Sequence, residues 1–159
     1  IMSALNKIGL DTQKSEKLSE LLSYLLSNYT IFYQNVRGSH WNVKGEKFFE
    51  LHLKFEELYN NLFLKIDEIA ERILTLGYAP NHKSSDYLKT SSIKETDEVN
   101  DGFKAVGNIL NSLQELLVKQ RVILDLSSEI NDEGTNSLMS DYIREQEKLV
   151  WMYSAFLNK

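Results

Sequence analysis

The chain has 159 residues, of which 42% are hydrophobic and 26% charged, a composition that suits one compact globular domain with a substantial core. It contains no cysteine, which excludes disulfides, thiolate metal sites and cysteine nucleophiles. The net charge of −5 disfavours non-specific binding to nucleic acid or anionic membranes and favours metal cations as partners.

The first expected element is a long amphipathic helix over residues 15–42. Apolar residues recur in it at spacings of three and four, as in Leu18, Leu21 and Leu22, which is the period of a helix. Ser15 is the expected N-cap, and residues 1–14 are expected to form a short N-terminal tail. No apolar run approaches the roughly 20 residues needed to cross a bilayer, and the N-terminus lacks a secretory signal pattern. We therefore expect a cytoplasmic protein without membrane contact.

A second helix is expected to begin at Phe48 and to end near Gly77, giving about 30 residues and a length of roughly 45 Å. Residues 78–96 contain the only proline, Pro80, and read as a crossover with a short helix around residues 85–89. Two further helices are expected over residues 103–123 and 138–156, separated by a break at residues 131–134. The pattern predicts one all-α domain over residues 1–159, a ferritin-like four-helix bundle with a short helix in the crossover between the second and third long helices.

The candidate metal ligands are concentrated in the first two long helices: His40, His52, Glu56, Asp67 and Glu71. Each of the pairs His52 with Glu56 and Asp67 with Glu71 is separated by four residues, so each pair can present two ligands from one helix face. An antiparallel return through Gly45 brings the imidazoles of His40 and His52 to about the same level.

One chain is not expected to gather all these ligands around one ion. His52 and Glu71 are 19 residues apart, which is almost 30 Å along a helix, although both pairs lie within about 100° of arc on one face. If two copies of this helix cross antiparallel about a two-fold axis, His52 and Glu56 of one copy face Asp67 and Glu71 of the other. The spacing therefore predicts two equivalent sites between subunits, and imidazole with carboxylate ligands suits iron(II) and zinc alike.

Simpler interpretations remain open at this point. His and carboxylate pairs at this spacing usually belong to a solvated face, and Asp67 and Glu71 can pair with Lys65 or Arg72 on the surface. Trp41 and Trp151 are expected to be core or interface anchors rather than redox groups. His82, which follows Pro80 and Asn81 in a loop, is expected to be solvated.

Several segments together resemble the Dps family, the mini-ferritins. They are residues 35–45, with the sequence Asn-Val-Arg-Gly-Ser-His-Trp-Asn-Val-Lys-Gly, residues 48–52 and 55–59, residues 67–73, the turn at 77–80, the crossover at 87–93 and residues 148–151. The resemblance covers nearly the whole chain, and the joint spacing of His40, His52, Asp67 and Glu71 is its most specific feature. No Glu-x-x-His motif of the larger ferritins is present.

The resemblance implies a dodecameric shell with ferroxidase sites at its dimer interfaces. In the family, histidines at the positions of His40 and His52 join acids at the positions of Asp67 and Glu71 from the two-fold partner, and an acid at the position of Glu56 contributes as a ligand or through hydrogen bonding. The implied activity is oxidation of Fe²⁺, with H₂O₂ preferred over dioxygen, and mineralisation of the ferric product inside the shell, which protects against oxidative damage. Zinc is an expected substitute metal.

Family shells admit iron through acidic pores near the start of the last helix, where this chain has Asp132, Glu133, Asp141 and Glu145. Family members that bind DNA usually use a mobile, lysine-rich tail, whereas this N-terminal segment mixes Lys7, Lys14 and Lys17 with acids. Twelve chains of charge −5 would carry −60, so we expect DNA binding to be weak or absent. The competing hypotheses are a DNA-compacting protein with incidental metal chemistry and a structural helical oligomer.

Overall fold

The computed structural model describes residues 4–97 and 100–159 of the chain. It confirms four long helices and a short helix in the crossover: α1 Thr12–Asn42, α2 Phe48–Thr75, α3 Ser84–Thr90, α4 Gly102–Glu129 and α5 Glu133–Phe156. The third long helix continues past Ile123 to Glu129, and the fourth begins at Glu133 rather than at Leu138, so both are longer than the apolar periodicity alone indicated. Asp101 caps α4 and Asp132 caps α5, each accepting hydrogen bonds from main-chain N–H groups of the first turn.

The start of α1 corrects one prediction. Its N-cap is Asp11, whose side chain accepts a hydrogen bond from the main-chain N–H of Lys14 at 3.0 Å. Ser15, the predicted N-cap, lies inside the helix and is buried. Of the expected tail, residues 1–3 lie outside the described residues, while the segment from Ala4 folds back so that the N–H of Thr12 donates to the Ala4 carbonyl at 3.0 Å.

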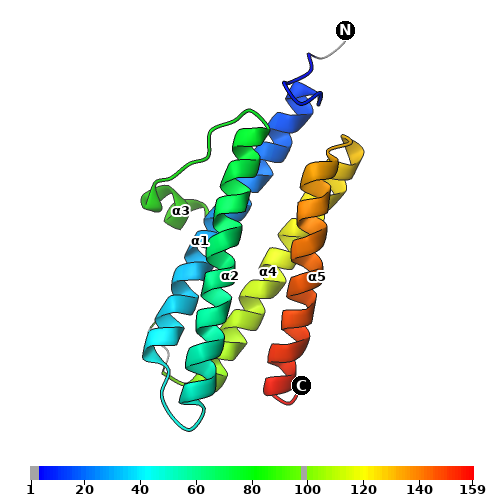
Figure 1. The fold of residues 1–159 in the computed structure, drawn as a ribbon. Helices are drawn as coiled ribbons and strands as arrows, with labels where there is room; N and C mark the ends of the chain where they lie inside the picture. The colour runs from blue at the N-terminus through cyan, green and yellow to red at the C-terminus, as the bar shows by residue number, and fades with distance from the viewer. Residues whose placement is uncertain (1–3, 98–99) are drawn as a thin grey trace.

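The four long helices run along the length of the molecule as two antiparallel hairpins (Figure 1). One hairpin consists of α1 and α2, and the other consists of α4 and α5. The connection between α2 and α4 returns along the bundle and carries α3 beside α1. Because of this crossover α2 and α4 run in the same direction, which is the connectivity of bundles with one long crossover.

The bundle interior contains a small polar network among its leucines and isoleucines. The Tyr29 hydroxyl donates to the Gln120 side chain at 2.5 Å and accepts from the Gln146 amide at 2.6 Å. Gln120 in turn donates to Gln146 at 2.8 Å. Each of these buried polar groups therefore has a partner, as burial without water requires.

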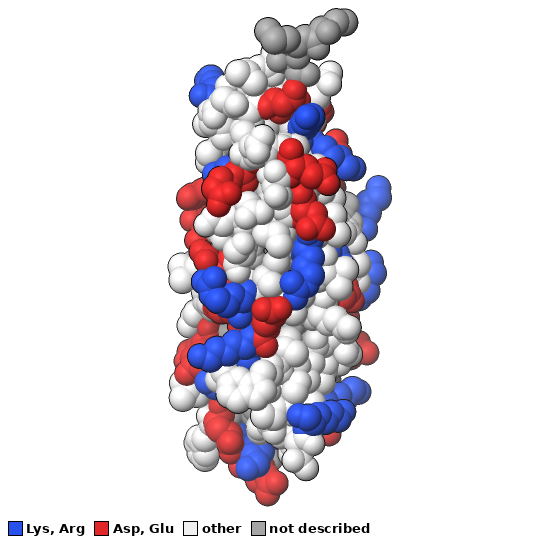
Figure 2. Space-filling model, turned by 90° about the vertical axis from the view of Figure 1, so that its right-hand side faces the viewer, with Lys and Arg blue, Asp and Glu red and all other residues white. Residues whose placement is uncertain are grey.

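Polar side chains also bridge α2 and α5. Buried Lys65 donates to Glu145 at 2.8 Å, and Tyr142 donates to Glu68 at 3.0 Å. On the side of the molecule that Figure 2 presents, acidic and basic side chains are interspersed rather than separated into large patches of one sign. None of the helices in the described parts of the chain combines the length and the apolar character needed to cross a membrane.

Candidate functional site: two half-sites on α2

His40, in the last turn of α1, and His52, near the start of α2, lie against each other as predicted. Their rings are stacked with centroids 3.8 Å apart and planes 13° apart. The short turn between the helices makes this contact possible, and Gly45 in it has a φ of 105°, a left-handed conformation that glycine adopts without strain.

Each of the two histidines is held by the main chain of the other. Nδ1 of His40 lies 2.6 Å from the His52 carbonyl oxygen, and Nδ1 of His52 lies 2.7 Å from the His40 carbonyl oxygen. Because a carbonyl oxygen can only accept, both Nδ1 atoms carry the proton and donate. In the neutral rings both Nε2 atoms then keep a lone pair, which is the form in which imidazole binds a metal.

Aromatic side chains enclose the histidine pair on both sides. Phe48 stacks on His52 at 4.9 Å, and Tyr59 meets the His40 ring edge-on at 5.2 Å. His40 is 7% exposed, so its ring has little freedom to turn. The sequence pattern identified the histidines but not these two neighbours, which periodicity had assigned simply to the apolar stripe.

Asp67 and Glu71 lie about one helical turn apart on the exposed side of α2. Their side chains form a hydrogen bond with each other, and this bond is the main cause that raises the pKa of Glu71, followed by the negative charge of Asp67. Two adjacent carboxyl groups bind a proton more tightly than one alone, because the proton removes the repulsion between two negative charges. A metal cation at the same place would serve the same purpose.

The structure does not support the surface pairing of Asp67 and Glu71 with neighbouring basic residues. Lys65 is directed to Glu145, and Arg72 forms an ion pair with Asp132 at 2.7 Å and a hydrogen bond with Thr135. The two basic side chains next to the acidic pair are thus committed to α5.

The histidine pair and the acidic pair do not come together within one chain. Among residues 4–97 and 100–159, no group of three or more His, Asp or Glu side chains is arranged to hold a metal ion. Glu56 lies half-buried one turn after His52 on α2. The predicted ligands therefore lie in two separate groups, one near each end of this helix, which we call the candidate half-sites.

Between and around the half-sites, the same side of α2 exposes large apolar side chains. Phe49 is 85% exposed and Phe63 is 59% exposed. The exposed apolar residues of α2 are Phe49, Leu53, Phe63, Leu64 and Leu74. Taken at about 100° per residue, they share a sector of roughly 120° with the four predicted ligands of this helix. An apolar face of this extent indicates a protein contact.

The acids near the start of α5 have different surroundings. Asp132 is buried and paired with Arg72, and Glu145 is paired with Lys65. Asp141 forms an exposed ion pair with Arg144 at 2.9 Å, and Glu133 is exposed in the first turn. Asp132 therefore has a structural role as an N-cap, so Glu133 and Asp141 are the better candidates for a pore.

The remaining residues of interest lie on the surface of the single chain. Trp41 is 57% exposed and Trp151 is 66% exposed, so neither belongs to the core and the interface interpretation remains. The Arg37 guanidinium lies 4.9 Å from the centroid of the Trp41 ring. His82 is exposed in the crossover, as predicted.

Comparison with known proteins agrees with the architecture. A family model described as the ferritin-like domain matches residues 19–159, which defines the chain as a ferritin-like protein. The DNA protection during starvation protein of Porphyromonas gingivalis is 41% identical over 151 residues, covering 95% of each chain.

Solved structures give the same result. The Dps protein of Vibrio cholerae O1, described as a member of the ferritin-like diiron-carboxylate superfamily, is 55% identical, covers 99% of each chain and superposes with a TM-score of 0.96. A Dps protein of Bacillus brevis is 34% identical, with a TM-score of 0.88 over 91% of this chain and 97% of that one. The chain therefore belongs to the Dps family. Membership in this family supports a general role in iron storage and protection against oxidative damage.

Proposed function

We propose that the protein is a ferroxidase whose iron sites form where two chains meet through α2. His40, His52 and Glu56 of one chain bind ferrous iron together with Asp67 and Glu71 of the other. The observation that carries the proposal is the exposed apolar face of α2, which contains both half-sites. A two-fold axis across this face places the histidine half-site of each chain against the acidic half-site of the other chain. The dimer then has two equivalent iron sites.

The substrate is Fe²⁺, and the preferred oxidant is H₂O₂. A carboxylate that bridges two ferrous ions keeps both close to one peroxide, which takes one electron from each ion. With two protons, the peroxide then becomes two water molecules, and no hydroxyl radical is released. The ferric product is stored as mineral inside a shell of twelve chains, and zinc competes for the same imidazole and carboxylate ligands.

The residues of the chain supply the geometry for this reaction. The main-chain hydrogen bonds of His40 and His52 fix the tautomer that binds metal. The raised pKa of Glu71 means that a proton and a cation compete for the acidic pair, so cation binding is favoured as the pH rises. These features preorganise each half-site before the second chain arrives.

A structural oligomer is the second candidate, because the exposed apolar face of α2 would by itself support assembly. The stacked, hydrogen-bonded histidines favour the metal site, since a contact surface alone does not require two metal-competent imidazoles. DNA compaction receives little support. The assembled charge is strongly negative, and the segment from Ala4 to Asp11 is folded against α1 rather than extended.

The proposal is tested by loading metal-free protein anaerobically with Fe²⁺ and then adding H₂O₂ below saturation, while ferric absorbance and trapped hydroxyl radical are followed together. The expected result is rapid oxidation of about two ferrous ions per peroxide with little trapped radical. Oxidation no faster than in buffer, with the full radical yield, would favour the structural oligomer.

A further inference from the structure

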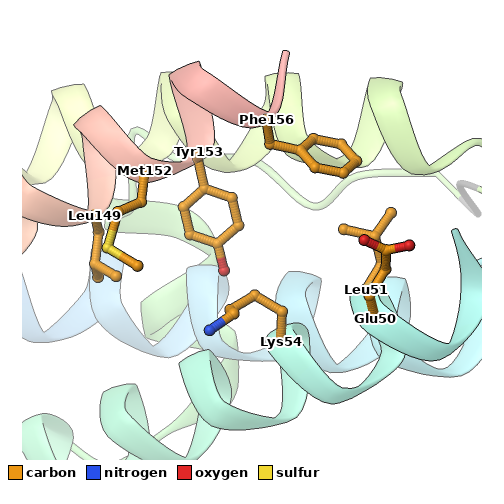
Figure 3. Close-up of a pocket in the computed structure, with 7 residues that line it drawn as sticks. All are labelled: Glu50, Leu51, Lys54, Leu149, Met152, Tyr153 and Phe156. Carbon is orange, nitrogen blue, oxygen red and sulfur yellow. The ribbon is translucent and has the colours of Figure 1, made fainter. Parts of the chain in front are cut away.

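An apolar groove lies between the first turns of α2 and the last turns of α5, on the other side of α2 from the proposed iron ligands. Its walls are formed by Leu51 and Lys54 from α2 and by Leu149, Met152, Tyr153 and Phe156 from α5 (Figure 3). The groove has a volume of about 150 Å³, which is the size of cavity that holds one aromatic ring.

Tyr153 gives this groove an unsatisfied polar group. The residue is 5% exposed, and within the described parts of the chain its hydroxyl has no hydrogen-bond partner. Figure 3 shows the hydroxyl directed toward α2, above the flexible side chain of Lys54. Burial, assisted by the negative charge of Glu57, raises the pKa of Tyr153, so the group is a neutral phenol. A buried phenol without a partner is unfavourable and invites a group that can hydrogen-bond to it.

Trp151 lies on the other side of the same helix. It is 66% exposed, and at about 100° per residue it points roughly 150° away from the mean direction of the four α5 residues that line the groove. An indole ring has an apolar body and one N–H donor that needs an acceptor when it is buried. These are the properties that the groove and the Tyr153 oxygen complement.

The charges beside the two surfaces are also complementary. Exposed Lys148 lies about one turn before Trp151. Glu50 lies at the groove, with its side chain 59% exposed and only a 3.7 Å ion pair to Lys47. A basic residue therefore accompanies the projecting ring, and an acidic residue accompanies the groove.

We propose that Trp151 of one copy of the chain inserts into this groove of a second copy. The flexible Lys54 side chain, which lies below the buried Tyr153 hydroxyl, moves aside so that the indole N–H donates to the Tyr153 oxygen. Lys148 of the inserting copy then faces Glu50 at the groove. Because the projecting ring and the groove lie on different sides of each chain, the contact is head-to-tail and must close into a ring to be finite.

This inference rests on the proposed function, which requires a shell. The two-fold contact through α2 ends at a dimer, so a shell needs a second kind of contact. In a closed shell of twelve equivalent chains that contains two-fold axes at its dimer contacts, head-to-tail contacts close in rings of three. The groove contact supplies this second kind.

The chain contains no cysteine, so an engineered disulfide can test the contact directly. The positions of Lys148 and Glu50 face each other in the proposed contact and can be changed while Trp151 and Tyr153 stay in place. We expect the double variant Lys148→Cys with Glu50→Cys to form disulfides between chains on mild oxidation, with a limit at three chains. Three chains of 18.4 kDa give a band near 55 kDa on a denaturing, non-reducing gel. Each single variant is the control and should not produce this band. A double variant that assembles but remains uncross-linked, or stops at two chains, would overturn the proposal.

A second measurement keeps both positions of the contact intact. Trp41→Phe leaves Trp151 as the only tryptophan, because the chain has two. In the assembled protein we expect its emission to be shifted to the blue and protected from acrylamide, and Tyr153→Phe in the same background should reduce the shift. Emission and quenching like those of free tryptophan would overturn the proposal and would indicate that a small molecule or nothing fills the groove.

Both readouts are independent of iron. If the wild-type protein fails to oxidise Fe²⁺, but the double-cysteine variant cross-links in threes and Trp151 is protected in the Trp41→Phe variant, the proposed function fails while the contact stands. If oxidation is rapid but neither readout responds, the contact fails alone.

Discussion

Nδ1 of His40 and Nδ1 of His52 each hydrogen-bond to the main-chain carbonyl of the other residue, at 2.6 and 2.7 Å. The arrangement ties the last turn of α1 to the second turn of α2 and fixes both rings in one tautomer. The two hydrogen bonds use only Nδ1, so Nε2 of each neutral ring keeps the lone pair that a metal ion binds. The first prediction therefore concerns this pair.

Replacing His52 by Gln keeps a polar side chain of similar length but removes the imidazole from the half-site. We expect the rate of ferrous oxidation by H₂O₂ to fall by about tenfold or more, in line with the loss of a metal-orienting or metal-binding group, while the assembly keeps its size. His82→Gln is the control, because His82 is exposed in the crossover, and it should retain the wild-type rate. Equal rates for both variants would contradict the assignment of His52.

Removing both carboxylates with Asp67→Ala and Glu71→Ala should abolish fast ferrous oxidation. Both side chains are exposed in the single chain, so their loss leaves no cavity and should not prevent folding. Glu57→Ala is a matched control on α2, because Glu57 forms only an exposed ion pair with Lys54. The rates are measured by stopped-flow absorbance and the size by light scattering. Loss of assembly in the double variant would favour the structural oligomer instead.

The pH dependence of cation binding follows from the raised pKa of Glu71. Below that pKa the carboxyl group is protonated, and a cation must displace the proton that it shares with Asp67. Affinity for Zn²⁺, a metal without redox chemistry, should therefore weaken as the pH falls, beginning above the usual range of a glutamate. Calorimetry in buffers of different ionisation enthalpy counts the released protons. Asp67→Asn removes the charge of the partner and should make affinity less sensitive to pH; an unchanged profile would argue against the shared proton.

Two glycines near the start of α4 should respond in opposite ways to alanine. A Cβ at Gly102 would overlap with Cδ1 of buried Leu51, whereas a Cβ at Gly107 would meet nothing within 4 Å. Gly102→Ala should therefore destabilise the protein by about 1–3 kcal/mol through overpacking. Gly107→Ala should stabilise it by about 1 kcal/mol through helix propensity. Thermal unfolding of both variants checks the prediction, and a stable Gly102→Ala protein would mean that α2 and α4 are less tightly packed than described.

The stability of the protein should depend on the single hydroxyl group of Tyr29 in the buried hydrogen-bond network. Tyr29→Phe removes the hydroxyl that Gln120 and Gln146 share and leaves their side chains without that partner. We expect a loss of about 1–3 kcal/mol in the free energy of unfolding. The double variant Gln120→Leu with Gln146→Leu in the Tyr29→Phe background should recover part of it, because no buried polar group then remains unpaired. Denaturant titration measures both effects, and an unchanged midpoint for Tyr29→Phe would show that water already replaces the hydroxyl.

The sequence predicted the helices well because their apolar spacing is regular and glycine and proline are rare within them. It misplaced the first helix boundary because Ser15 and Asp11 are both good capping residues, and only the fold of the preceding segment selects Asp11. The closeness of His40 and His52 followed from the short turn at Gly45. The enclosing rings of Phe48 and Tyr59, the commitment of Lys65 and Arg72 to α5, and the groove at Tyr153 depend on contacts between distant segments, which periodicity along one helix does not contain.

The central claim is that each iron site takes its ligands from two chains, and complementation tests it most directly. His52→Ala and Asp67→Ala should each be inactive alone. When the two variants are co-expressed at equal levels and assemble at random, about a quarter of the sites should combine a wild-type His52 from one chain with a wild-type Asp67 from the other, restoring about a quarter of the rapid oxidation. A mixture as inactive as either variant, although mass spectrometry shows mixed assemblies, would contradict a site shared between chains.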